Sequence, residues 1–200
     1  MKLILVRHGE TPENKKGILQ GHLNSSLSKE GIKQAKKLSL RLKNEKIDKI
    51  FVSDLKRTVQ TAKELIKYHP NTEVIYEQMI RERDLGNLQG RSLKELIEES
   101  KKSGLSMFKF KPKRGESHSD LKKRIKKFFR DLMKKESGKT ILLVTHGGPI
   151  AHLLLYFLKL PFKKIKECKS GHTGISIIEV DINDGNHKIN LINCTKHLEK

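Results

Sequence analysis

The sequence has 200 residues and a formal net charge of +20, with hydrophobic residues at 35% and charged residues at 33%. These values are typical of one very polar globular domain, so we expect a single domain over residues 1–200 and no disordered chain. No apolar run approaches the roughly 18 residues that a membrane span needs. The charge predicts an anionic partner. An aromatic content of 5% without Trp disfavours nucleic acid, because the stacking platforms of a single-strand binder are sparse.

The cellular compartment is predicted from the first residues and from the cysteines. The apolar run before Arg7 is too short for a signal peptide. Cys168 and Cys194 are too few for a disulfide framework in a chain of this size, so we expect free thiols. The sequence therefore predicts a cytoplasmic protein without a membrane partner. It leaves the oligomeric state open, with a homo-oligomer among the alternatives.

Strand-length apolar runs alternate with helical patterns along the first half of the chain. Residues 2–7 predict a strand and residues 26–44 a helix, and the same pair recurs as a strand over 49–54 and a helix over 54–68. Residues 73–79 predict a third strand. The residues that carry the helical patterns are the caps Ser28 and Asp54 and the apolar positions Ile32, Ala35, Leu38, Leu42, Leu55, Val59, Ala62 and Ile66.

The second half continues the alternation and then changes it. Residues 92–103 predict a short polar helix, residues 117–136 a long basic one, and residues 139–158 a buried strand that turns into a helix. Residues 175–193 predict two strands joined by a tight reversal. The residues that mark the turns are Pro149, in the first turn of its helix, and Asp184 and Gly185, in the hairpin.

The order of these elements predicts an α/β fold, a three-layer α/β/α sandwich whose mostly parallel sheet is closed by a C-terminal antiparallel hairpin. In such a fold, ligands bind beyond the carboxyl ends of the strands. Residues 84–116 have the weakest periodicity and several glycines, and we expect them to form a lid.

Two predicted strands end in a histidine followed by glycine, His8 and His146. Arg7 adds a planar fork suited to phosphate oxygens, and Arg57 lies one turn into the helix that Asp54 is expected to cap. Glycine frees backbone N–H groups to approach an anion. These strand ends therefore predict an anion site. The remaining histidines are interpreted as ordinary core or surface side chains: His22, His69, His118, His152, His172, His187 and His197.

Six ordered blocks then resemble the histidine phosphatase superfamily, in its phosphoglycerate-mutase-like branch. The blocks are RHGET, QGHLNSSLSKEGIKQA, SDLKRTVQTA, RERDLGNLQG, GESHSDLKKR and VTHGG, and they span nearly the whole chain. The resemblance implies a six-stranded mixed sheet between helices, in agreement with the pattern. It also implies a phosphatase that needs neither a metal nor another cofactor, with a small phosphorylated metabolite as substrate and inorganic phosphate as product.

The resemblance also implies roles for single residues. His8 would be the nucleophile and become phosphohistidine, Arg7, Arg57 and His146 would bind the phosphoryl group, and Glu82 would donate the proton. A neutral imidazole suits the role of the nucleophile near pH 7. Cationic side chains can hold the charge that is spread over the oxygens of the transferring phosphoryl group. The substrate-binding candidates are Thr11, Asn14, Gln20, Gly21 and Gly147.

Departures from the family pattern narrow the function. In the block after Gly21, Asn24 and Ser26 differ from the residues that the family usually has at these positions. Leu85 stands where the mutases have a substrate-contacting tyrosine. Residues 84–116 also lack the paired arginines of the mutases, so hydrolysis is favoured over mutase activity. A basic binding protein on an inactive phosphatase scaffold is the remaining alternative. The intact set of nucleophile, acid and phosphate-binding residues argues against it.

Overall fold

The computed structural model describes residues 1–181 and 186–199. Its six strands form one sheet in the order β3-β2-β4-β1-β5-β6. The pairs β2–β3, β2–β4 and β1–β4 are parallel, and β1–β5 and β5–β6 are antiparallel. The predicted mixed sheet with its C-terminal antiparallel pair is therefore confirmed. The strands are β1 (Lys2–Arg7), β2 (Lys49–Val52), β3 (Glu73–Tyr76), β4 (Thr140–Thr145), β5 (Ile175–Val180) and β6 (His187–Cys194).

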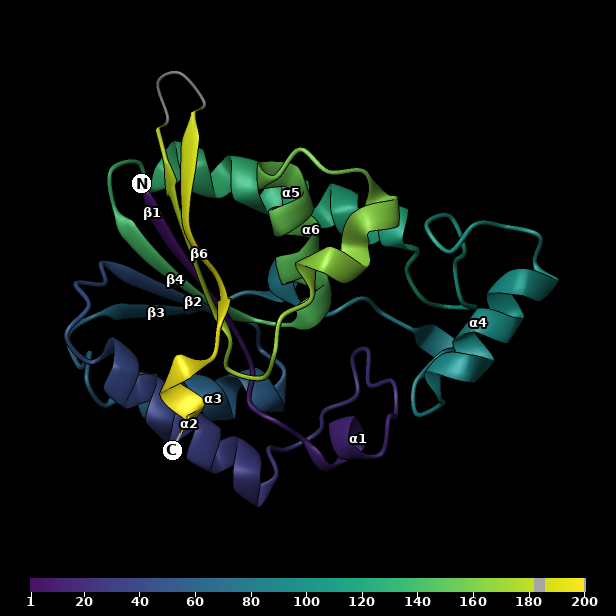
Figure 1. Ribbon diagram of the computed structural model, residues 1–200, viewed down its shortest axis with the longest axis horizontal. Helices are drawn as coiled ribbons and strands as arrows, with labels where there is room; N and C mark the ends of the chain where they lie inside the picture. Colours follow the sequence, from purple (N-terminus) through teal and green to yellow (C-terminus); the bar gives the residue numbers. More distant parts are fainter. Residues whose placement is uncertain (182–185, 200) are drawn as a thin grey trace.

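Helices cover both faces of the sheet (Figure 1). Successive side chains of β1 point to opposite faces, so Leu3 and Leu5 enter the core under α5 and α6, and Ile4 and Val6 enter the core under α2 and α3. All four residues are fully buried. The α-helices are α1 (Pro12–Lys15), α2 (Lys29–Leu42), α3 (Lys56–Ile66), α4 (Leu93–Lys102), α5 (His118–Lys135) and α6 (Gly147–Phe157).

The helix starts follow local capping. The side chain of Ser28 accepts from the Gly31 amide to begin α2, and Ser92 and Ser117 form capping boxes that begin α4 and α5. Pro149 lies in the first turn of α6 and is buried.

Both cysteines are free thiols, as expected. The predicted hairpin turn at Asp184 and Gly185 lies outside the described residues.

Two expectations about the helices were wrong. Ile32 is 40% exposed, because α2 turns its apolar stripe toward the sheet through Ala35, Leu38 and Leu42. Asp54 does not cap α3: Leu55 is the cap residue, without a side-chain hydrogen bond. The carboxylate of Asp54 instead accepts from Arg81 Nε at 2.6 Å.

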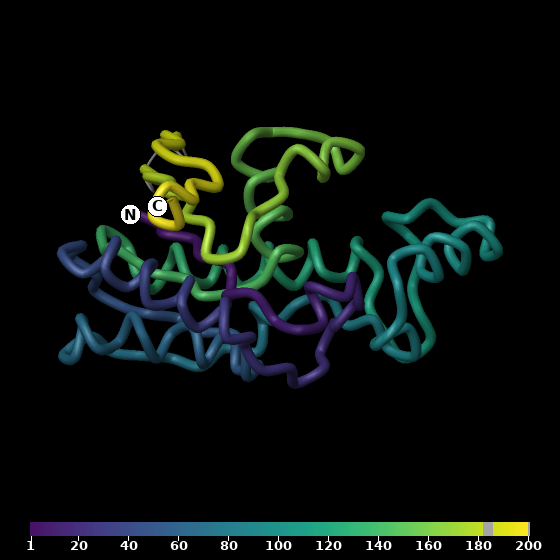
Figure 2. The backbone as a smooth tube through the Cα atoms, turned by 60° about the horizontal axis from the view of Figure 1, so that its bottom comes forward, coloured from purple at the N-terminus to yellow at the C-terminus, as the bar shows by residue number. Residues whose placement is uncertain are grey.

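Residues 84–116 project from one end of the molecule (Figures 1 and 2). They contain a short 3-10 turn over Gly86–Leu88 and helix α4, with a small apolar cluster of Leu85, Leu88, Leu96 and Phe110. The Leu19 amide donates to the Arg91 carbonyl at 2.8 Å, which joins this projection to the segment after α1. Within the described residues, no helix is long and apolar enough to cross a membrane.

A pair of histidines, the half-buried His118 and the buried His152, joins α5 to α6. His118 Nδ1 lies 3.2 Å from His152 Nε2, and burial lowers the pKa of His118 to about 2 and that of His152 to about 4. An unfolded histidine has a pKa near 6.5, so the unfolded chain takes up protons first as the pH falls. The stability contributed by the neutral pair is complete above pH 6.5 and is lost below it.

We therefore expect the melting temperature to fall as the pH is lowered from 6.5 to 5, a window above most carboxylate titration. The loss in unfolding free energy is about 2 kcal/mol for each histidine over this window. Thermal melts of the protein and of the double variant His118→Gln/His152→Gln measure it. The variant should show a shallower pH dependence, and an unchanged slope would rule out this pair as its source.

Candidate active site

His8 lies at the carboxyl end of β1 and is only 3% exposed. Its Nδ1 lies 2.7 Å from the Gly9 carbonyl. Since a carbonyl only accepts, Nδ1 carries the hydrogen and Nε2 keeps its lone pair. Burial, and next the charges of Arg7 and Arg57, hold the pKa of His8 well below its usual value. His8 is therefore a neutral imidazole with a fixed tautomer.

His146 follows the neighbouring parallel strand, β4, and is fully buried. Its ring lies 5.2 Å from the ring of His8, in an edge-on arrangement. Nε2 lies 2.8 Å from the Ser53 hydroxyl, at the end of β2. Burial, followed by the charge of Arg57, holds the pKa of His146 far below 6.5. The carboxyl ends of β1, β2 and β4 therefore meet at one edge of the sheet, because these three neighbouring strands are parallel.

The two arginines are anchored by backbone carbonyls, and among the described residues neither has a carboxylate in hydrogen-bond contact. Arg7 Nη1 donates to the Ser170 carbonyl at 2.6 Å. Arg57 is 1% exposed and donates at 2.8 Å to the carbonyls of Leu23 and Gly21. Burial lowers the pKa of both groups, to about 10 for Arg57. Both stay charged near pH 7, so the described site is electropositive.

Glu82 reaches the same site from the segment after β3. Its Oε2 accepts from the Gly148 amide at 3.0 Å and its Oε1 from the Arg83 amide at 2.8 Å. The carboxylate acts on the pKa of both Arg7 and Arg57, raising each against the larger effect of burial. The first turn of α6 therefore aims this carboxylate beside the two guanidinium groups.

The glycine pair at the start of α6 gives a matched test of this placement. A Cβ on Gly148 would overlap the carboxylate of Glu82, whereas at Gly147 it would meet nothing closer than Arg7 Nε at 3.7 Å. We expect Gly148→Ala to lower kcat about 10²-fold, the low end of the range for the acid–base role that the sequence resemblance implies for Glu82. Gly147→Ala should lower kcat much less. An equal loss of kcat in both variants would mean that displacing the Glu82 carboxylate has no effect on catalysis. Circular dichroism controls for folding.

Of the five substrate-binding candidates, Gly21 and Gly147 lie against the arginines of this site. Thr11 and Asn14 form the capping box of α1, so the Asn14 side-chain oxygen accepts from Thr11 and only its amide nitrogen remains to donate. The Gly21 carbonyl holds Arg57, and Gly21 has a φ of +51°, which a side chain would strain. Gln20 is 7% exposed, and its Oε1 has no hydrogen-bond partner among the described residues.

The structure adds a histidine that the pattern did not single out. The ring of His172 lies 6.1 Å from that of His8, and burial lowers its pKa to about 4. Its interpretation as an ordinary side chain stays a prediction, although the structure places it beside His8. No motif marks it, because it belongs to the loop that reaches Arg7 only when β5 pairs with β1. Among the described residues, no three His, Cys, Asp or Glu side chains form a group that could hold a metal ion.

The family is shown by comparison with known proteins. The histidine phosphatase superfamily (branch 1) matches residues 3–195 of this chain. A probable phosphatase from Schizosaccharomyces pombe is 34% identical over 206 residues, covering 100% of this chain and 96% of its own length. Phosphoserine phosphatase 1 from Hydrogenobacter thermophilus is 33% identical and covers 99% of this chain and 94% of its own. The chain belongs to the histidine phosphatase superfamily.

Solved structures agree with this assignment. A variant phosphoserine phosphatase from Entamoeba histolytica, in complex with phosphoserine, has a TM-score of 0.86 at 30% identity and covers 98% of each chain. The resemblance drawn from the six sequence blocks is confirmed. With phosphatases matching along nearly its whole length, this chain is a phosphatase of that family.

Proposed function

We propose that this phosphatase hydrolyses a small phosphorylated metabolite through a phosphohistidine intermediate on His8. The observation that carries the proposal is the buried, neutral His8, whose Nδ1–H is fixed on Gly9 while two charged arginines lie beside it. An imidazole in this state is a nucleophile, and the arginines favour the phosphoryl group as its target. The relatives named as phosphoserine phosphatases support a small substrate.

In the proposed first step, His8 Nε2 attacks phosphorus in line with the leaving oxygen. Charge on the equatorial phosphoryl oxygens is held by Arg7, Arg57 and His146, whose positions are fixed by carbonyls and by Ser53 before substrate arrives. Preorganised donors of this kind lower the barrier because they need no reorientation during the reaction.

In the same step, Glu82 protonates the leaving alkoxide. The negative charge of a bound phosphate favours the acid form of the neighbouring carboxyl. After the product alcohol leaves, the resulting carboxylate removes a proton from the water that attacks phosphohistidine, and inorganic phosphate is released. Glu82 would thus return to its acid form for the next cycle.

Metal independence is the first test of this mechanism. Side chains supply the positive charge, so we expect EDTA to leave the hydrolysis of a panel of phosphomonoesters unchanged within about twofold. Vanadate should compete with substrate, because it occupies the same cationic pocket. Activity that appears only with added Mg²⁺ would contradict the proposal. Isomerisation of 3-phosphoglycerate with a bisphosphoglycerate primer, faster than hydrolysis, would favour a mutase instead.

Residues 84–116 are proposed to act as a lid over this site within a single domain. Both ends of the segment are tied to the same place: the Glu116 amide donates to the Asp84 carbonyl at 2.8 Å. The guanidinium of Arg124 bonds Glu116 at 2.6 Å and the Glu82 carbonyl at 3.1 Å. The base of the projection therefore shares contacts with the proposed acid.

We expect the enzyme to work in the cytoplasm on small molecules, without nucleic acid.

A further inference from the structure

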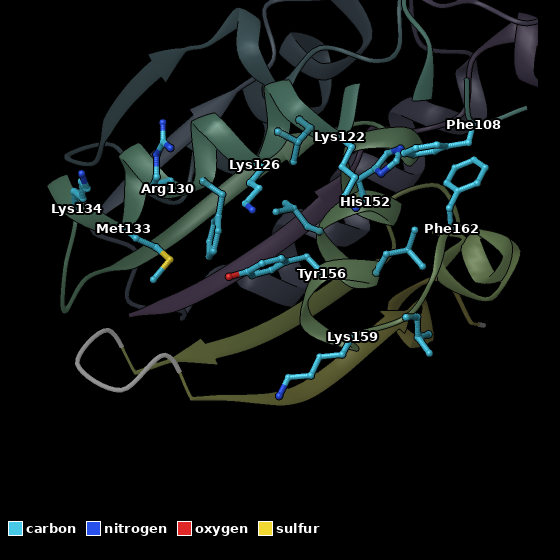
Figure 3. Close-up of a pocket in the computed structure, with 15 residues that line it drawn as sticks. Phe108, Lys122, Lys126, Arg130, Met133, Lys134, His152, Tyr156, Lys159 and Phe162 are labelled. Carbon is cyan, nitrogen blue, oxygen red and sulfur yellow. The ribbon is translucent and has the colours of Figure 1, made fainter. Parts of the chain in front are cut away.

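A second concave surface lies between α5 and α6, in one outer helical layer of the sandwich (Figure 3). The cavity has a volume of about 580 Å³. Its walls are mainly apolar and include Ile125, Phe129 and Met133 from α5 and Leu153 from α6. Tyr156 lines it as well and remains 54% exposed. This volume lies within the roughly 300–1,000 Å³ of small-molecule sites, so the cavity has the size and character of one.

The side chains around this apolar surface are positively charged. Five of the lining residues are cations and none is acidic, namely Lys122, Lys126, Arg130, Lys134 and Lys159. The first four repeat at every fourth residue along α5 and are all exposed. Like charges at this spacing destabilise a helix. The described partner of Arg130 is Asp131 at 3.8 Å, an exposed pair of little strength. An anion in the cavity would relieve this repulsion.

The cavity is separate from the chemistry of the phosphatase site. Its polar lining includes His152, but that imidazole faces His118 at 3.2 Å and stacks on Phe162. The lining contains no nucleophile placed like His8 and no carboxylate. Apolar walls with a cationic border therefore indicate binding without reaction.

We propose that this cavity binds a small amphipathic anion, an alkyl chain that carries a single carboxylate head. The chain lies against Phe129 and Met133, and the head group is held by Lys126, whose ammonium points toward Tyr156, within a border that Arg130 makes more positive (Figure 3). A concave cavity favours a free molecule over a membrane, which would meet a flat surface. A second copy of the chain is disfavoured, because a symmetric interface would bring two sets of these cations together.

Calorimetric titration of the full chain with octanoate, decanoate and dodecanoate, below micelle-forming concentrations and at low salt, tests the proposal. Burying each methylene strengthens binding about fourfold, so we expect affinity to rise about fifteenfold for each step of two carbons until the cavity is filled. Dodecylammonium has the same chain and the opposite head charge, and it should bind at least tenfold more weakly than dodecanoate.

Two charge-reversal variants separate the cavity from the net charge. Lys126→Glu/Arg130→Glu alters exposed residues of the border and should weaken dodecanoate binding at least tenfold. Lys36→Glu/Lys63→Glu makes the same charge change on α2 and α3, on the opposite face of the sheet, and should leave binding within about twofold. Thermal melts of both variants are the control for folding.

Four outcomes would overturn the proposal. Equal binding of dodecylammonium would show that the cations do not select the ligand, and equal weakening in both variants would show an unspecific effect of charge. Binding to anionic vesicles without binding to free dodecanoate would indicate a membrane surface. Self-association that only Lys126→Glu/Arg130→Glu abolishes, without carboxylate binding, would indicate an interface between copies.

Discussion

Replacing His8 with alanine is expected to abolish turnover, lowering kcat by at least about 10⁴-fold. Loss of a nucleophile removes the covalent route altogether, and the remaining cations bind phosphate without providing an attacking atom. The ring of His8 lies 5.2 Å from that of His146 and 6.1 Å from that of His172. His146 is fully buried and its Nε2 is engaged with Ser53, whereas His172 is half-buried. Steady-state hydrolysis of nitrophenyl phosphate measures the loss.

Trapping the phosphoenzyme makes this expectation specific to the intermediate. A phosphoryl group transferred from labelled substrate should survive alkaline quenching, be lost in acid, and be absent from His8→Ala. His187→Ala is the matched control, because His187 pairs with Val180 at the end of the sheet opposite to His8. Normal turnover in His8→Ala, or an acid-stable label, would exclude phosphohistidine at this position.

Glu82→Gln is expected to slow the transfer of a phosphoryl group from sugar phosphates far more than from nitrophenyl phosphate. A sugar alkoxide needs a proton as the bond to phosphorus breaks, whereas nitrophenolate leaves unaided. The phosphorylation step should fall about 10²–10⁴-fold for the sugar phosphate, the usual size of general acid catalysis. The glutamine oxygen can still accept from Gly148, but the hydrogen bond from the Arg83 amide is lost, because the second carboxylate oxygen becomes an amide nitrogen that only donates.

Single-turnover measurements are needed because the same carboxylate is proposed to activate water in the second step. Steady-state rates would then fall for both substrates and hide the difference. Equal losses in the phosphorylation step would show that Glu82 is not the acid. Glu10→Gln and Asp84→Asn would then be compared, although Glu10 already accepts from Ser28 and Asp84 from the Gly86 amide.

The fold was predictable because the central strands β1 and β4 are dense apolar runs and α2, α4 and α5 each begin at a capping serine. The runs ending at Arg7 and Thr145 are buried on both faces, and only a sheet covered by two helical layers accommodates them. His8 and His146 were found for the same reason, since parallel register brings the residues after both strands together. Their mutual placement is confirmed by the ring distance of 5.2 Å.

The remaining details depend on contacts between distant segments, which local patterns do not encode. Asp54 looked like a helix cap, but Arg81 competes for its carboxylate with two hydrogen bonds. His172 lies near His8 only because residues 170–174 fold back on β1, where the Thr173 amide donates to the Arg7 carbonyl at 3.1 Å. The functional roles of the site residues stay predictions until the variants above are measured.

The central position of β1 has a consequence for how the protein is made. Its partners, β4 and β5, are encoded after residue 139, so Leu3, Ile4, Leu5 and Val6 leave the ribosome long before either edge of the strand can pair. Contacts this distant in sequence form slowly, and an unpaired apolar strand is prone to aggregate. The nascent chain must therefore keep its first strand from aberrant pairing through most of translation, and the dense lysines after residue 28 help by repelling other copies.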